Sequence, residues 1–449
     1  MTRARTRRPG GGDGDGRLGS ASGRQSNPYL ELLRLPGALA FSAAGFLARM
    51  PMSMFGLGTV LLVAAVTGRY GLAGLVAAAG SVCYALAAPQ FARLCDRFGQ
   101  RRVLRPQVAV FGVTTVAFMT AAELRAPLAA VIVPAALAGA TMPSVGSMVR
   151  ARWSVLLAGT GRLHTAFSLE SVADEIIFVV GPALVTLLAT AVYPAAGVGA
   201  ATVLCVTGTL LFAAQRRTEP QPRRPPRQRT PPLPWRRRGG RIPPVPAPRR
   251  AGTWAAVPGL ATLVPVYLFL GAMFATIDLS TVGFSAEHGH IAIAGLVLGT
   301  YALGSAIGGL WYGSRRWRAP LERRFAITLA ITVTGVATFW AQPNLMTLDL
   351  SMLVAGLTIS PTLIAGYSLV ERQASEVRQT EAMTWLSSTI SVGVAIGSAV
   401  AGQLVDISGP RLSFAFAACC GVLAVAVCLV GQGKLRATGE SRAAQWVDA

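Results

Sequence analysis

Long apolar segments separated by short polar segments recur along the whole sequence. Each apolar segment has about the 20 residues that an α-helix needs to cross the hydrocarbon core of a bilayer. The expected helices cover 37–66, 71–94, 106–122, 128–149, 166–189 and 194–214, and then 257–283, 291–312, 325–341, 348–369, 382–405 and 412–430. The pattern therefore predicts an all-α integral membrane protein with about twelve transmembrane helices.

A hydrophilic segment at 215–252 divides the expected helices into two groups of six. It is rich in arginine and proline, and proline at this density is incompatible with a helix, so we expect a semi-rigid linker. The expected organisation is a disordered tail at 1–35, a six-helix bundle at 36–214, the linker at 215–252, a second six-helix bundle at 253–432 and a short tail at 433–449.

A repeated segment relates the two halves. The first copy begins with AGLV at Ala73 and ends in an arginine cluster at Arg102, and the second begins with AGLV at Ala294 and ends at Arg318. Small residues fill the middle of both copies. Parallel repeats of about six helices are a known plan of transporters. The repeat therefore predicts two pseudo-symmetric bundles.

The composition excludes several classes of protein. Hydrophobic residues make up 52% of the 449 residues and charged residues only 13%, which is too little charge for the surface of a soluble protein. The net charge of +22 comes from arginines between the apolar segments rather than along one face, which argues against a nucleic-acid partner. The six cysteines lack metal-binding spacings, and no phosphate-binding loop of the GxxxxGK(S/T) type occurs. We therefore expect no metal, no cofactor and no enzyme activity.

The arginines also indicate the orientation in the membrane. If the N-terminus is cytoplasmic, the inside loops contain many arginines, among them Arg150, Arg152 and those of the linker. The outside loops then hold little more than Arg69, Arg125 and Arg411. Positive charge accumulates in cytoplasmic loops of membrane proteins. We expect a multi-pass protein of the cell membrane with both termini in the cytoplasm, whose linker arginines are a tether and topology signal or contact anionic lipid headgroups.

The turn that ends the first copy resembles a signature of the major facilitator superfamily, found between the second and third helices of that family. The matching residues are Asp96, Arg97, Gly99, Arg101 and Arg102. The family usually has glycine where this chain has Ala92, four residues before the aspartate. The equivalent position in the second copy keeps a glycine, Gly313, which is followed by Arg315 and Arg316. The resemblance implies a secondary active transporter of the bacterial efflux type that works by alternating access, with both turns as cytoplasmic gate elements.

Arg49 is the most informative charge within the apolar segments. The apolar stretch before it is about twelve residues long, too short to span a bilayer alone, so Arg49 lies inside the first helix. Pro51 is expected to bend that helix. A charge in the hydrocarbon core costs roughly 2.5–3.5 kcal/mol or more. Arg49 therefore either faces a central cavity and binds an anionic group or a coupling carboxylate, or forms a structural ion pair inside the bundle.

Three carboxylates, Glu170, Asp174 and Glu175, lie in the expected fifth helix. Glu170 and Asp174 are four residues apart and share a face, but Glu170 is close enough to the cytoplasmic end of the helix to be solvated. Asp174 and Glu175 are deeper, where desolvation favours uptake of a proton. Gly181 and Pro182 follow on the same helix, at the position where antiporters of the superfamily carry a glycine-rich motif, and are expected to bend it.

Two more carboxylates belong to the second half. Asp278 lies in the expected seventh helix, and the resemblance implies that it lines the substrate cavity together with Arg49. The alternative is a position at the outer water boundary, since the expected helix ends a few residues later. Glu381 precedes the expected eleventh helix. The resemblance implies that Asp96 stabilises a closed inner gate near that end, with Glu381 as a gate residue.

Together these features predict a proton-coupled efflux transporter for a small organic molecule or drug. The expected substrate or coupling-ion residues are Arg49, Asp174, Glu175 and Asp278. Efflux is favoured because the cavity-lining helices are apolar, with few hydrogen-bonding groups for a sugar. Two alternatives stay open: uptake of an organic anion held by Arg49, and a membrane sensor or the permease subunit of a pump whose ATPase is a separate protein.

Overall fold

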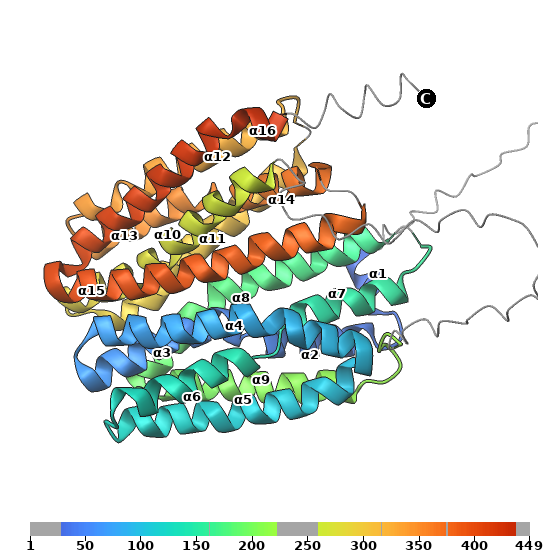
Figure 1. Cartoon of the computed structure of the whole chain (residues 1–449), viewed down its shortest axis with the longest axis horizontal. Coiled ribbons are helices and arrows are strands. Elements are labelled where there is room, and N and C mark those ends of the chain that lie inside the picture. The colour runs from blue at the N-terminus through green and yellow to red at the C-terminus, as the bar shows by residue number, and fades with distance from the viewer. Residues whose placement is uncertain (1–27, 161, 222–258, 316, 374–375, 437–449) are drawn as a thin grey trace, which may run out of the picture.

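The computed structural model describes residues 28–160, 162–221, 259–315, 317–373 and 376–436, and every regular element in these ranges is a helix (Figure 1). Eleven described segments are long and apolar enough to cross a membrane. The last of them, Trp385–Val430, contains two crossings because the backbone leaves the helical conformation at Gly409 (φ 80°), directly before Pro410. The described residues thus form twelve crossings, and the predicted all-α fold is confirmed.

The first half of the chain forms one bundle. Its elements are α1 (Pro28–Leu33), α2 (Ala38–Arg49), α3 (Pro51–Thr67), α4 (Tyr70–Phe98), α5 (Gln100–Glu123), α6 (Leu128–Thr141), α7 (Val145–Leu156), α8 (Leu163–Ala191) and α9 (Ala196–Ala214). The first crossing consists of α2 followed by α3, and the fourth of α6 followed by α7. Phe111 and Phe118 of α5 are fully buried in its apolar core.

The second half forms the other bundle, which occupies the upper part of Figure 1. Its elements are α10 (Leu260–Glu287), η2 (Ile291–Ile293), α11 (Ala294–Ser314), α12 (Leu321–Val336), η3 (Phe339–Ala341), α13 (Leu345–Gly356), α14 (Ile359–Gln373), α15 (Glu376–Val430) and α16 (Gln432–Arg436). Helix α10 is the most deeply buried of the spans. Its Tyr267 and Phe284 pack in a core with Phe325, Phe339 and Phe414.

The halves meet where α4 packs against α15 and α8 packs against α11, and α4 and α15 lie side by side in the middle of Figure 1. Glycines allow this close approach. A Cβ atom on Gly74 of α4 would lie 2.1 Å from the carbonyl oxygen of Ser398, and one on Gly295 of α11 would lie 2.2 Å from that of Pro182. In a membrane, small residues of this kind let helix backbones pack directly against each other.

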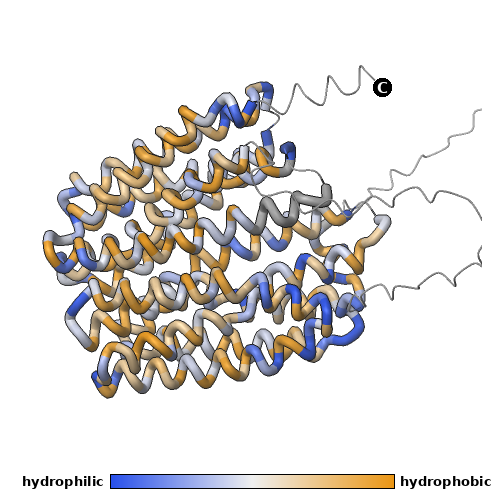
Figure 2. The backbone as a smooth tube through the Cα atoms, viewed as in Figure 1, coloured by the Kyte–Doolittle hydropathy of each residue, from blue (hydrophilic) through white to orange (hydrophobic). Residues whose placement is uncertain are grey.

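The molecule has two distinct ends. One end carries the α4–α5 turn with its arginines, and hydrophilic residues are most abundant there in Figure 2; we call it the arginine-rich end. At the opposite end, called the far end, Asp406 of α15 accepts hydrogen bonds from the backbone N–H groups of Tyr70 (2.7 Å) and Gly71 (2.6 Å) at the start of α4. The far end is therefore joined across the two halves.

The second and third crossings are longer than the sequence pattern predicts. Helix α4 continues to Phe98 and α5 begins at Gln100, so a single residue, Gly99, makes the expected turn. Its φ of 94° is accessible to glycine without steric cost. The gate residues Asp96 and Arg101 therefore lie on helix ends rather than in a loop.

Parts of the predicted organisation fall on residues that the structure does not describe. These are the ranges 1–27, 222–258 and 437–449, together with Arg316 and the side chain of Glu381. Most of the expected tails and of the linker lie in them. The end of the first expected tail is not disordered as predicted, because it forms α1 and buries Leu32. The expected seventh helix is also longer than predicted, since α10 ends at Glu287. Asp278 is therefore well inside a membrane span and not beside its end.

Candidate functional site

Arg49 is the last residue of α2, and Pro51 is the first of α3. A proline inside a helix lacks the N–H that would continue the hydrogen-bond ladder, and the two helices are separated at Met50. Arg49 is only 4% exposed. Its Nε donates to the carbonyl oxygen of Gly45 (3.1 Å), one turn earlier, which holds the guanidinium against α2 and directs it toward α8.

The guanidinium of Arg49 is shared by two carboxylates of α8. Nη2 donates to Oε2 of Glu170 and Nη1 donates to Oδ1 of Asp174, both at 2.6 Å. The two carboxylates lie four residues apart, so they project from one face of the helix. Arg150 of α7 donates to the other oxygen of Asp174 at 2.8 Å. We call Arg49, Arg150, Glu170 and Asp174 the charge cluster.

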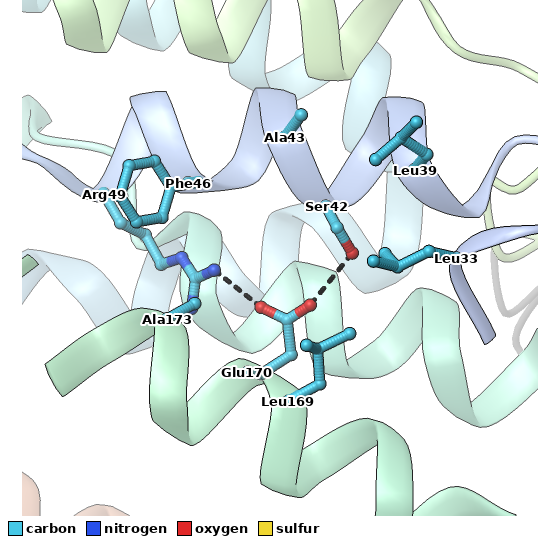
Figure 3. Close-up of a pocket in the computed structure, with 9 residues that line it drawn as sticks. All are labelled: Leu33, Leu39, Ser42, Ala43, Phe46, Arg49, Leu169, Glu170 and Ala173. Atoms are coloured by element: carbon cyan, nitrogen blue, oxygen red, sulfur yellow. Dashed lines mark hydrogen bonds and ion pairs between the residues drawn. The ribbon is translucent and has the colours of Figure 1, made fainter. Parts of the chain in front are cut away.

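Glu170 is buried and fully hydrogen-bonded. Its Oε1 accepts from Ser42 Oγ of α2 (3.0 Å) and from Trp153 Nε1 of α7 (2.8 Å), while Oε2 accepts from Arg49. Figure 3 shows the contacts with Ser42 and Arg49, beside a cavity of about 180 Å³. Only 1% of Glu170 is exposed. Such a carboxylate is tolerated inside a bundle because each oxygen has a donor.

The charge cluster has no excess charge, because two guanidinium groups face two carboxylates. Arg49 could bind an external anion only if Glu170 or Asp174 gave up its ion pair. Removing the partner of a buried charge is strongly unfavourable. The geometry therefore pairs Arg49 with internal carboxylates.

Glu175 is adjacent to Asp174 in the sequence but contacts the other half of the molecule. Its Oε1 accepts a hydrogen bond from Ser360 Oγ of α14 at 2.8 Å. Ser360 Oγ is also 2.7 Å from Ser305 Oγ of α11. Consecutive residues of a helix project about 100° apart. Asp174 therefore contacts arginines of the first half, whereas Glu175 contacts a serine of the second half.

Asp278 is not part of the charge cluster. Its side chain is exposed, although every other residue from 275 to 285 of α10 is buried. It forms no ion pair and no hydrogen bond with the described residues. The neighbouring helix α11, which contacts α10, carries Tyr301. Tyr301 is 8% exposed, and its hydroxyl has no hydrogen-bond partner within the described part of the chain.

The expected gate residues lie at the arginine-rich end. Ala92 is half-buried, and Asp96, Arg97 and Arg102 are exposed near the α4–α5 turn. The backbone N–H of Arg101 donates to a carboxylate oxygen of Glu219 (2.9 Å), which caps the start of α5. In the second half, Gly313 and Arg315 are exposed at the end of α11, where the Arg315 guanidinium lies 5.1 Å from the centre of the Trp311 ring.

Gly181 and Pro182 lie inside the continuous helix α8. A Cβ atom on Gly181 would lie 1.9 Å from Ser53 Oγ of α3, so this glycine allows α3 to contact α8 closely. Ser53 Oγ donates to the carbonyl oxygen of Ile177 at 2.9 Å. Gly181 and Ser53 thus fix the packing of α3, in the first crossing, against α8, which carries the carboxylates.

The sequence-based prediction that Arg150 and Arg152 lie in a cytoplasmic loop is wrong. Both lie in α7, and Arg152 is fully buried. Its Nε donates to Gln100 (2.9 Å) and its Nη1 to Thr218 (3.0 Å), and its guanidinium lies 3.7 Å from the centre of the Phe212 ring. Sequence reasoning also left Glu170, Arg150 and Trp153 out of the site. The sequence did signal that the helix continues through Arg152, since the apolar residues Val149 and Trp153 are four residues apart on either side of it.

A family model described as Major Facilitator Superfamily matches residues 41–313 and 263–446. No match was found among the curated proteins.

Several solved structures share the fold. The nucleoside transporter NupG has 15% identity and a TM-score of 0.61, covering 89% of this chain and 98% of that chain. The human organic anion transporter TETRAN has 15% identity and a TM-score of 0.59 over 88% and 99%. A bacterial homologue of the iron transporter ferroportin, in an inward-facing state, has 14% identity and a TM-score of 0.62 over 88% and 99%. At these identities the likeness shows the fold alone.

Proposed function

The chain belongs to the major facilitator superfamily of transporters, and from this premise we propose that it is a proton-coupled carrier that exports a small organic molecule by alternating access. The observation that carries the proposal is the sharing of buried Arg49 by Glu170 and Asp174, one turn apart on α8. Buried charges within a membrane protein are costly, and they commonly mark ion or proton pathways.

Asp174 is the proposed site of proton binding. Its side chain is 20% exposed, whereas that of Glu170 is 1% exposed, so water reaches Asp174 more easily. A proton on Asp174 removes its charge and weakens its ion pairs with Arg49 and Arg150, while Glu170 still balances Arg49. The contacts of α8 with α2 and α7 would then loosen. Binding and release of a proton are thereby coupled to the position of α8.

The movement of α8 is proposed to affect both halves because Glu175 contacts Ser360 in the second half. The halves are joined at the far end by Asp406 and by closely packed glycines. We assign the arginine-rich end to the cytoplasm, since arginine accumulates in cytoplasmic loops. The conformation is then closed toward the outside. The inward-facing state named for the ferroportin homologue supports this assignment.

Uptake of an organic anion by Arg49 is a weaker proposal. TETRAN is named as an organic anion transporter, but its likeness to this chain concerns the fold. Both terminal nitrogens of the Arg49 guanidinium are bound to carboxylates, so an anion would compete with groups that are already in place.

The test is proton flux in proteoliposomes during transport of lipophilic cations, organic anions and uncharged antibiotics. We expect proton movement opposite to that of the transported compound. Asp174→Asn should abolish proton movement, because an amide side chain does not bind a proton near neutral pH. Glu123→Gln is the matched control, since Glu123 is exposed at the end of α5. Transport without proton movement, unchanged in Asp174→Asn, would contradict proton coupling.

A further inference from the structure

Asp278 is a carboxylate without a cationic partner deep in a membrane span. It lies nine residues before the end of α10 at Glu287, which corresponds to roughly 13 Å along the helix axis. Its neighbours on both sides of the chain are buried while its own side chain is exposed. Because α10 is enclosed by other helices at this level, the exposure points to an internal space that water can enter and not to the surrounding lipid.

Tyr301 provides a second, independent observation. Its hydroxyl has no hydrogen-bond partner within the described ranges, although the residue is only 8% exposed. Its ring is held in place by Phe339, at 6.2 Å between ring centres in an edge-to-face arrangement. Buried hydroxyl groups are nearly always hydrogen-bonded, by protein or by another molecule. An unpartnered hydroxyl on α11, the helix that contacts α10, is therefore a group that a ligand can bind.

The balance of charge decides which kind of ligand fits. The positive charges of Arg49 and Arg150 are matched by Glu170 and Asp174. Glu175 and Asp278 have no arginine partner among the described residues. The interior between the halves therefore carries an excess of negative charge, which attracts cations and repels anions.

We propose that Asp278 and Tyr301 form the polar part of a binding site for an organic cation with an apolar body. This inference rests on the proposed transport function, because it names the class of substrate. The apolar part of the site is supplied from the same helix face: Phe274, four residues before Asp278 on α10, is half-buried and presents an aromatic ring. An aromatic ring attracts a cation.

The test is equilibrium binding of tetraphenylphosphonium to the full-length protein in detergent, compared with tetraphenylborate. The two ions have the same size and shape but opposite charge. We expect binding of the cation and no binding of the anion. Asp278→Asn should weaken binding of the cation by at least about tenfold, and Asp278→Glu should keep most of it. Tyr301→Phe should weaken binding by a smaller factor.

Asp349→Asn is the control for loss of one negative charge in the same half, since Asp349 of α13 is hydrogen-bonded to Thr300 and belongs to neither proposed site. Its binding should equal that of the wild type. Thermal unfolding of each variant shows whether it is folded. Equal binding of both ions, or unchanged binding in a folded Asp278→Asn variant, would overturn the proposal.

The binding test can fail while the proton-flux test succeeds, and the proton-flux test can fail while the binding test succeeds. Binding is measured without a membrane or a gradient, so it does not depend on proton coupling by Asp174. Cation binding that requires Asp278, together with transport that moves no protons, would keep this inference and reject the proposed coupling. Proton-coupled transport, together with equal binding of the two ions, would keep the proposed coupling and reject this inference.

Discussion

At the scale of single residues, the guanidinium of Arg49 holds three helices together. It contacts the backbone of α2 and both carboxylates of α8, and Arg150 adds α7 through Asp174. Glu170 depends on this contact more than Asp174 does, because Asp174 has a second arginine and a more exposed side chain. We therefore expect the pair of Arg49 and Glu170 to contribute mainly to the stability of the fold, whereas Asp174 is the residue proposed to bind the proton.

Arg49→Ala should destabilise the protein by about 3–5 kcal/mol, because it leaves the charge of Glu170 buried without its partner. The double variant Arg49→Ala/Glu170→Gln should recover a large part of this loss, since no uncompensated charge is left. Thermal unfolding in detergent measures both effects. If the double variant is less stable than Arg49→Ala alone, the ion pair does not explain the stability.

The sequence could show some of these residues and not others. Arg49 and Asp174 interrupt apolar segments, and a charge in such a place needs a partner. Glu170 lies near a helix end where solvation is equally compatible with the pattern. The side-chain bond from Trp153 to Glu170 and the burial of Arg152 depend on how α7 packs against α5 and α8, which a linear pattern does not contain.

At the scale of elements, the contact between α4 and α15 depends on glycine at a few positions. Gly74 faces the carbonyl oxygen of Ser398, and Gly402 faces that of Tyr70. The expected lengths of the helices were correct to within a few residues, but the pattern placed a loop where Gly99 alone makes the turn. Arginines and a proline near a helix end look like loop residues, whereas here they continue the helices beyond the apolar part.

Gly74→Leu should prevent the halves from closing at the far end. Even a Cβ atom would lie 2.1 Å from the carbonyl oxygen of Ser398, and backbone cannot move aside as a side chain does. We expect loss of transport by the reconstituted protein, with each bundle still folded. Gly56→Ala is the control, because nothing lies within 4 Å of a Cβ atom there. Normal transport by Gly74→Leu would show that far-end closure is not required.

At the scale of the whole molecule, two bundles are joined by few polar contacts, at different levels of the membrane. Asp406 caps the start of α4 at the far end, and Glu175 accepts from Ser360 nearer the middle. The number of crossings and the division into halves could be predicted, since hydropathy and the repeat contain them. The end at which the halves are closed could not be predicted, because both conformations of such a carrier have the same sequence.

Asp406→Ala should loosen the far end. The carboxylate satisfies two backbone N–H groups that have no partner inside α4, and loss of such a cap costs about 1 kcal/mol. Amide hydrogen exchange in the first turn of α4 should become faster by about fivefold. Ile407→Ala, at an exposed neighbouring position, should leave the exchange unchanged. Equal exchange rates in the two variants would mean that Asp406 does not hold the halves together.

The bond between Trp153 and Glu170 gives the protein an optical reporter of its own. The indole of Trp153 is fully buried, packs against Phe41 at 4.8 Å between ring centres, and donates its N–H to the carboxylate that balances Arg49. The emission of an indole depends on the charge beside it. Of the eight tryptophans, this one can be isolated by subtracting the spectrum of Trp153→Phe, so rearrangement of the charge cluster during a transport cycle can be followed in real time without an attached dye.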